Sequence, residues 1–288
     1  MYKMNPKYIG EILKNTDEVF VYLNPAYPGE ICKKHNLVRT DKQSRKELQD
    51  RRNKCIDIKN DSNWPSFVIK PTNVGKMNKE CFTVRYPFIE GDTIANYIKK
   101  NDISLEECAI FIKKLEEQLA NANDYVFTDI GNPNNIIIQD SSFNFTVIDP
   151  DNILFKDYRD AAISSVVSPA FVRDISVYGL RKCRRYNKYT KQLELRSMYA
   201  LLYFMMNGYD RFYPPFIERS CFGEYIDILS KLNIPESSDL FRKTMQTLYS
   251  NKPNEPIGDS LFELLKNGYE FETYDKDSSG YKHVLVKK

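Results

Sequence analysis

Carboxylate and amide side chains lie at the ends of two short apolar runs in the middle of the chain, between residues 125 and 154. Asp129 and Asn135 precede the first run, and Asp149 ends the second. If the two runs pair as a β-hairpin, these side chains can bring their oxygens to one point. Mg²⁺ prefers such ligands, usually one or two carboxylates completed by phosphate oxygens. The pattern therefore indicates phosphoryl transfer, in which positioning and charge neutralisation supply most of the catalysis.

The same residues also have simpler explanations. Asp, Asn, Gly and Pro all favour turns, so Asp129 in the sequence TDIGNPNN and Asp149 before a proline could be turn residues only. The chain has just two histidines, His35 and His283, so we expect Asp, Glu or Lys to carry out any general acid–base catalysis.

The composition is that of a globular protein, with 42% hydrophobic and 28% charged residues in a chain of 288. The net charge of +3 is too small to imply a polyanion partner by itself, so a nucleic-acid partner is disfavoured. Six cysteines without a CxxC pair disfavour a zinc site and indicate reduced thiols. The longest apolar run, 198–206, is far shorter than the roughly 20 residues of a membrane span, and no signal peptide is evident. We therefore expect a cytoplasmic protein with no membrane partner.

The first part of the chain is rich in strand-forming residues. Residues 8–35 contain three short runs separated by turn sequences, and two further runs follow at 66–70 and 81–88. Thr40, with Gln43 three residues later, forms a capping-box pattern that predicts a helix between these runs.

The rest of the chain is mostly helical in pattern. Residues 104–122 have apolar side chains at helical spacing, and the region after 193 reads as helical until a polar tail at 274–288. Because strands and helices do not alternate, a doubly wound sheet is disfavoured. We predict an α+β protein with a β-rich domain at 1–88 and a mostly helical domain at 89–288, the latter containing the catalytic hairpin.

In order and spacing, five motifs across roughly residues 8–266 resemble the protein-kinase-like superfamily. They are similar to its hinge, catalytic loop, metal-binding Asp motif, central helix and last helices: VRYPFIEGDTIANYI (84–98), TDIGNPNNIII (128–138), VIDPD (147–151), ELRSMYALLYFMMNG (194–208) and LFRKTMQTLYSNKPNEPIGDSLFELL (240–265). The resemblance implies a two-lobed protein-kinase-like fold, a small β-rich N-lobe with one helix and a larger helical C-lobe, that uses ATP and Mg²⁺.

The resemblance also implies roles for the residues of the hairpin. Asp129 would be the catalytic base or would orient the acceptor hydroxyl, and Asp149 would bridge Mg²⁺ to the phosphates, with Asp151 as a further metal-binding candidate. The amide ligand would be Asn135 or Asn134. Only Asn134 keeps the family's step from the catalytic Asp, whereas Asn135 directly precedes the aliphatic run and is preferred.

The nucleotide-binding residues follow from the same resemblance. The phosphate-pairing lysine would end the third strand, at Lys33 or Lys34, with Lys33 preferred and Glu47 as its helix partner. A solvated lysine pair and a solvated Glu47 are the simpler alternatives. Adenine would meet the backbone near Tyr86–Phe88, and Gly10 is what remains of a glycine-rich loop.

The chain departs from the family pattern at several positions. Phe127–Thr128 replaces His-Arg and Pro150–Asp151 replaces Phe-Gly, so control by a phosphorylated activation loop is not predicted. Glu194 replaces the central-helix Asp, and its longer side chain could still reach the catalytic loop. Arg173 and Glu255 carry the reverse of the family's charges, which predicts an inverted ion pair.

Three functions are compatible with these residues. The leading hypothesis is a Mg-ATP-dependent kinase acting on protein serine or threonine hydroxyls. A small-molecule kinase is supported by the IDxD pattern, and a nucleotide-binding pseudokinase by the weak glycine loop and the lost His-Arg. The basic run 181–191 could bind an acidic or phosphate-bearing partner, although a solvated basic loop is the commoner origin of such a run.

Overall fold

The computed structural model describes residues 10–127, 129–155, 188–208, 233–249, 255–278 and 280–288. The chain divides into two compact units, Met1–Glu90 with Ile148–Asp151, and Gly91–Val147 with Asn152–Lys288. The first change of unit lies two residues beyond the boundary expected from the sequence. The return of four residues, Ile148–Asp151, to the first unit has no counterpart in the sequence pattern.

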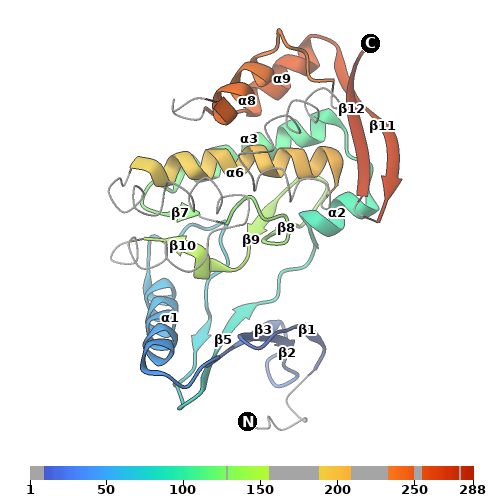
Figure 1. Cartoon of the computed structure of the whole chain (residues 1–288). Coiled ribbons are helices and arrows are strands. Elements are labelled where there is room, and N and C mark those ends of the chain that lie inside the picture. The colour runs from blue at the N-terminus through green and yellow to red at the C-terminus, as the bar shows by residue number, and fades with distance from the viewer. Residues whose placement is uncertain (1–9, 128, 156–187, 209–232, 250–254, 279) are drawn as a thin grey trace. The chain divides into compact units, whose positions relative to one another are not determined.

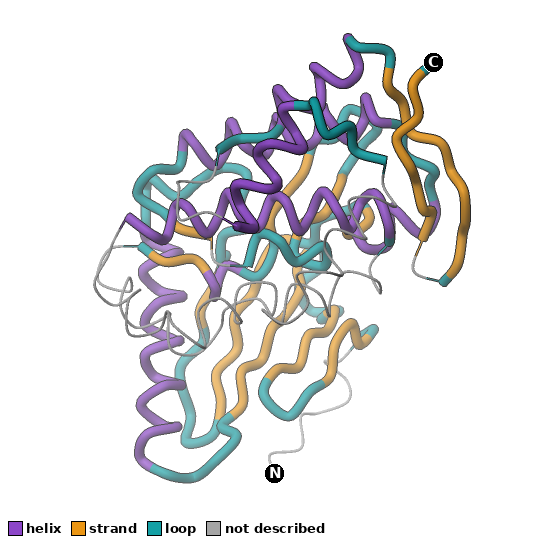
Figure 2. Tube along the Cα trace, turned by 45° about the horizontal axis from the view of Figure 1, so that its top comes forward, coloured by secondary structure: helices purple, strands orange, loops and turns teal. Residues whose placement is uncertain are grey.

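The first unit contains a five-stranded antiparallel sheet in the order β1-β2-β3-β5-β4. Figure 2 shows its longer strands side by side in orange. Its strands are β1 (Ile12–Asn15), β2 (Val19–Leu23), β3 (Glu30–Asn36), β4 (Asn73–Val74) and β5 (Cys81–Pro87). The turn between β2 and β3 ends at Gly29, whose φ of 79° suits glycine. The predicted strand at 66–70 is wrong, because this segment is a turn with a single bridge residue, and its apolar side chains fill the core without a ladder.

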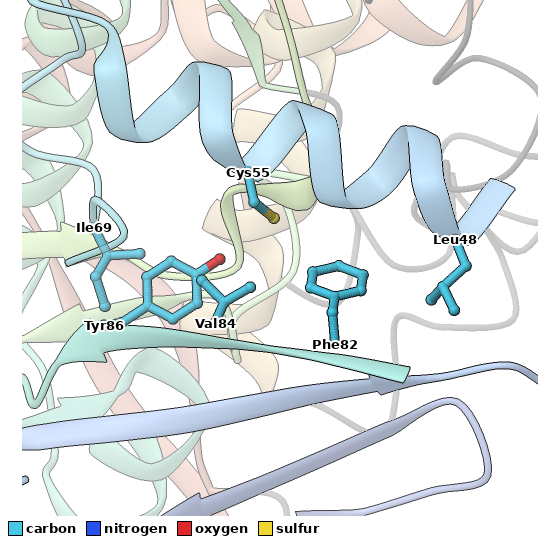
Figure 3. Packing of buried hydrophobic residues seen from close by; sticks show 6 residues of the cluster. All are labelled: Leu48, Cys55, Ile69, Phe82, Val84 and Tyr86. Carbon is cyan, nitrogen blue, oxygen red and sulfur yellow. The ribbon is translucent and has the colours of Figure 1, made fainter. Parts of the chain in front are cut away.

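Helix α1 (Lys42–Asn60) covers one face of this sheet. Its N-cap is Asp41, which accepts a hydrogen bond from the Ser44 amide, so the predicted cap at Thr40 is wrong by one residue. The core between helix and sheet is formed by Leu48, Cys55, Ile69, Phe82, Val84 and Tyr86 (Figure 3). This packing fixes which face of β3 and β5 points toward α1.

The second unit is built around helices, as the sequence predicts (Figure 1). They are α2 (Ile94–Lys100), α3 (Leu105–Asn121), α6 (Lys188–Asn207), α8 (Asp239–Tyr249) and α9 (Gly258–Lys266). Ser104 and Glu107 form a capping box at the start of α3, so the helix predicted at 104–122 is confirmed. The buried Glu116 of α3 accepts hydrogen bonds from the amides of Ile257 and Gly258, and thereby caps α9, which has no side-chain cap of its own.

Two small sheets position the predicted catalytic segment of the second unit. Strands β6 (Asp92–Thr93), β8 (Ile136–Ile138) and β9 (Phe145–Val147) form one, and β7 (Val126–Phe127) pairs with β10 (Ile153–Leu154). The predicted hairpin is confirmed, because β8 and β9 are antiparallel with Ile136 opposite Val147. The segments before β8 and after β9 therefore leave the ladder at the same end.

The C-terminal segment is a β-hairpin and not the polar tail that follows helices in the sequence prediction. Strands β11 (Tyr269–Asp277) and β12 (Gly280–Lys287) pair antiparallel, and β12 packs against α2 and α6. Its polar residues find partners when buried: Lys282 pairs with Asp277, and His283 lies 2.7 Å from Asp102. The polar composition of this segment therefore gave no indication that it forms a buried strand.

The described residues thus form an α+β protein with antiparallel sheets. None of the helices in this part of the chain is both long and apolar enough to cross a membrane.

Candidate functional site

The first unit brings together the predicted lysine and the two carboxylates of the IDPD segment. Lys33 Nζ lies 2.6 Å from Asp149 Oδ1 and 2.8 Å from Asp151 Oδ2. Lys33 comes from β3, whereas the carboxylates lie 116 and 118 positions later, in the segment that returns to this unit. Together with His35 and Lys54, these residues are called the charged cluster below.

The contacts on the two faces of β3 decide between the two candidate lysines. Lys33 and His35 project from the same face of β3, and both lie against Asp151. Lys34 projects from the opposite face, paired in register with Phe20 and Thr83 on the neighbouring strands. Lys33 is therefore the lysine that meets the carboxylates.

The backbone at Asp149 has an unusual conformation. Its φ of 67° lies in the left-handed region, which costs energy for most residues but which Asp tolerates better than most. The turn redirects the chain directly after the IDPD motif begins, and leaves the Asp149 side chain 31% exposed, compared with 14% for Asp151. Strained residues of this kind cluster at functional sites.

Asp151 is enclosed by groups from β3 and α1. Lys54 Nζ donates a hydrogen bond to its backbone carbonyl at 2.5 Å, and His35 Nε2 lies 3.6 Å from its Oδ2. The His35 ring stacks on Phe82 at 4.8 Å between centroids. Cys55 Sγ lies 4.0 Å from the remaining oxygen, Oδ1. Neither His35 nor Lys54 was predicted from the sequence as part of this cluster; only the position of His35, two residues after Lys33 on the same strand, could have indicated it.

Burial and charge set the protonation of this cluster. Burial opposes charge on both Lys33 and Asp151, but attraction outweighs it: Asp149 and Asp151 raise the pKa of Lys33, and Lys33 holds the pKa of Asp151 far below its ordinary value. Burial lowers the pKa of Lys54 to about 8 and that of His35 to about 4. At neutral pH, Lys33 and Asp151 are therefore ionised and His35 is neutral.

The second unit holds the predicted catalytic loop between β7 and β8. Asn135 is buried, and its Nδ2 donates a 2.6 Å hydrogen bond to Asp129 Oδ2. Asn134 is exposed, and its backbone amide donates to the side chain of Asn132 in the turn. The loop is also tied to the start of α2, because the Ala95 amide donates to the Pro133 carbonyl. Of the two asparagines, Asn135 is thus the one whose side chain contacts Asp129.

Glu194 of α6 supports the chain two residues before Asp129. Its Oε1 accepts a 2.6 Å hydrogen bond from the Phe127 amide, and its side chain is buried. The expectation that this longer carboxylate could reach the catalytic loop region is confirmed for Phe127. A buried charge-assisted bond across 67 residues fixes where the loop begins.

Glu47, the predicted partner of Lys33, lies elsewhere. It is on the exposed face of α1, where it accepts a hydrogen bond from Gln43. The prediction of a Lys33–Glu47 pair is wrong, because the helix turns its acidic residues toward solvent while Lys33 is satisfied by Asp149 and Asp151.

The residues predicted to contact the nucleotide have structural partners. The Tyr86 side chain lies in the core against α1 (Figure 3), and the exposed Phe88 donates its backbone amide to the Gly29 carbonyl at 2.7 Å. Gly10 donates to the Leu23 carbonyl, and a Cβ at this position would lie 2.7 Å from that oxygen. The close approach of the two backbones explains the glycine.

Two further predictions fall on other parts of the chain. Arg173 and residues 181–187 of the basic run lie outside the described residues, and 188–191 begin α6. Glu255, the predicted partner of Arg173, lies 2.9 Å from Arg242 of α8.

Among the described residues, no group of three or more His, Cys, Asp or Glu side chains is arranged to hold a metal ion. Mg²⁺ does not require such a group, because it binds one or two carboxylates and completes its shell with water and phosphate oxygens. Asp149 fits this role, since its carboxylate is the more exposed of the two. Taken by itself, Asn135 of the second unit also has the chemistry of a Mg²⁺ ligand, because an amide that donates through its nitrogen can coordinate a cation through its oxygen.

No protein-family model matches the sequence, and a search of curated proteins gives no match.

Proposed function

We propose that the protein is a Mg-ATP-dependent phosphotransferase with a two-lobed protein-kinase-like fold. The observation that carries this proposal is the contact of Lys33 with Asp149 and Asp151, which joins a strand lysine to the carboxylates of a distant hairpin. A purely structural core has no need to bury a cation between two carboxylates, because apolar residues of similar volume serve stability equally well.

In this proposal the residues of the first unit bind the nucleotide phosphates and Mg²⁺. Lys33 pairs with phosphate oxygens, which share with carboxylates the charge and geometry that an ammonium group recognises. Asp149 contributes a carboxylate to Mg²⁺, which when bound would neutralise charge on the phosphates. The rigid β3 strand and the strained turn at Asp149 keep the two groups in place before the nucleotide arrives.

The residues of the second unit orient and deprotonate the acceptor hydroxyl. Asp129 orients the acceptor hydroxyl and accepts its proton, and the bond from Asn135 fixes the direction of the Asp129 carboxylate. Glu194 and the pairing of β7 with β10 hold the chain that enters the loop. The resemblance of the helices after residue 193 to those of protein kinases favours protein serine and threonine hydroxyls as acceptors.

The test is transfer of label from γ-labelled ATP with Mg²⁺, using protein and small hydroxyl compounds as acceptors. We expect incorporation by the wild-type protein and a large decrease in its rate in Lys33→Met, Asp149→Ala and Asp129→Ala. Lys34→Met is the matched control, because it removes the neighbouring lysine from the opposite face of β3 and should leave transfer unchanged. Equal activity of Lys33→Met and Lys34→Met would refute the assignment of Lys33. Label on small hydroxyl compounds alone would identify a small-molecule kinase.

A nucleotide-binding pseudokinase is the second candidate. The weak glycine-rich loop, of which Gly10 remains, and Phe127–Thr128 in place of His-Arg favour it over an active kinase. In that case Mg-ATP would raise the melting temperature of the wild-type protein without any turnover. Absence of both turnover and stabilisation by Mg-ATP would exclude both candidates.

A further inference from the structure

In the charged cluster, the two carboxylates that contact Lys33 have different surroundings. Asp149 is the more exposed and sits at a strained turn, whereas Asp151 is enclosed. Both oxygens of Asp151 face groups of β3 and α1: Oδ2 faces Lys33 and His35, and Oδ1 faces Cys55. Enclosure on both oxygens suits a carboxylate that holds an ammonium group, and leaves little room for a hydrated metal ion.

Helix α1 does not supply a carboxylate to Lys33. Its acidic residues, Glu47, Asp50 and Asp57, all lie on its exposed side. The helix instead turns the buried Lys54 inward, and Lys54 donates to the backbone carbonyl of Asp151. The helix thus acts on Lys33 indirectly, by fixing the position of the residue that binds it.

We propose that Asp151 is a positioning residue that holds the Lys33 ammonium group in place for the nucleotide phosphates, and that Lys54 anchors Asp151 from α1. Asp149 is then the exchangeable partner: on nucleotide binding, Lys33 replaces Asp149 by phosphate oxygens and keeps Asp151. This inference rests on the proposed function and reassigns Asp151, which the sequence analysis considered a metal-binding residue.

A direct test observes the Lys33 ammonium group without any nucleotide. Lysine ammonium groups held by carboxylates exchange slowly enough to give ¹H–¹⁵N signals, and the signals lost in Lys33→Met and in Lys54→Met identify these two lysines. We expect the Lys33 signal to be lost in Asp151→Asn and to persist, shifted, in Asp149→Asn. The reverse pattern would overturn the proposal. This readout is independent of turnover, so the positioning of Lys33 can stand even if the proposed function fails.

A kinetic double-mutant cycle tests the consequence for catalysis. Misplacing a binding group by about 1 Å can cost about 100-fold, so we expect Asp151→Asn to lower kcat/KM for ATP by about that factor. In the Lys33→Met background the same substitution should cost less than about threefold, because Asp151 acts through Lys33. The Mg²⁺ concentration for half-maximal activity should rise in Asp149→Asn and stay unchanged in Asp151→Asn. Additive losses would show that Asp151 acts independently of Lys33, and a raised Mg²⁺ requirement in Asp151→Asn would identify it as a metal ligand; either result would overturn the proposal.

Discussion

The buried His35 makes the stability of the first unit depend on pH in a direction that can be worked out. His35 is fully buried, stacks on Phe82 and lies 3.6 Å from Asp151. Burial lowers its pKa from the ordinary 6.5 to about 4, more than the nearby Asp151 carboxylate raises it. The folded state therefore keeps the imidazole neutral over a pH range in which the unfolded chain protonates it.

The sign and size of the effect follow from linkage. A base whose folded pKa is depressed contributes stability that is fully present above its unfolded pKa and is lost as the pH falls toward the folded pKa. For His35 the stability is lost as the pH falls from about 6.5 to about 4. Between about pH 7.5 and about pH 4.5, the loss attributable to His35 is about 2.5 kcal/mol.

Urea unfolding followed by tryptophan fluorescence measures this loss of unfolding free energy in the first unit. The single tryptophan, Trp64, is buried in the first unit, so its emission reports on the unfolding of that unit. Unfolding in the presence of EDTA at the two pH values should show a fall in free energy that is about 2.5 kcal/mol smaller for His35→Gln than for the wild-type protein.

His283→Gln is the control for this experiment. It removes the other histidine, which lies in the second unit, and should leave the pH dependence of the Trp64 signal unchanged. Wild-type protein and His35→Gln losing the same free energy would refute the reasoning that burial keeps His35 neutral.

Three further substitutions test the buried polar contacts. Lys33→Met should destabilise the first unit by about 3–5 kcal/mol in urea unfolding, because it leaves Asp151 buried without its counter-charge; a further Asp151→Asn should recover part of the loss, and no recovery would contradict the ion pair. Glu194→Ala should lower the unfolding free energy of the second unit by about 1–3 kcal/mol, measured by circular dichroism, because the Phe127 amide loses its acceptor. Glu116→Ala should cost a similar amount, about 1–3 kcal/mol, by leaving the first amides of α9 without an acceptor, and increased amide exchange at Ile257 is the diagnostic sign; unchanged exchange there would count against the cap.

Structural features that depend on residues close together in the chain could be predicted from the sequence. The helix at 104–122, the β8–β9 hairpin and the helices after residue 193 all follow from turn residues and short-range periodicity. The cap of α1 was misplaced by one residue because Thr40 and Asp41 are both good cap residues, and only the backbone decides which one is used.

Tertiary structure decided the partners of the charged residues. Strand alternation shows that Lys33 and Lys34 face opposite ways, but not which way the core lies; the packing of α1 on the sheet settles that. The Lys33 contacts span 116 and 118 residues, a separation on which no local pattern bears. The C-terminal hairpin was missed for the same reason, since Lys282 and His283 look like surface residues until Asp277 and Asp102 compensate their burial. The sequence by itself determined most of the local elements and which residues carry charge, because these depend on neighbours along the chain. Which charges meet, and whether the C-terminal segment forms a buried hairpin, was decided only by the fold, because burial and pairing depend on segments far apart in the chain.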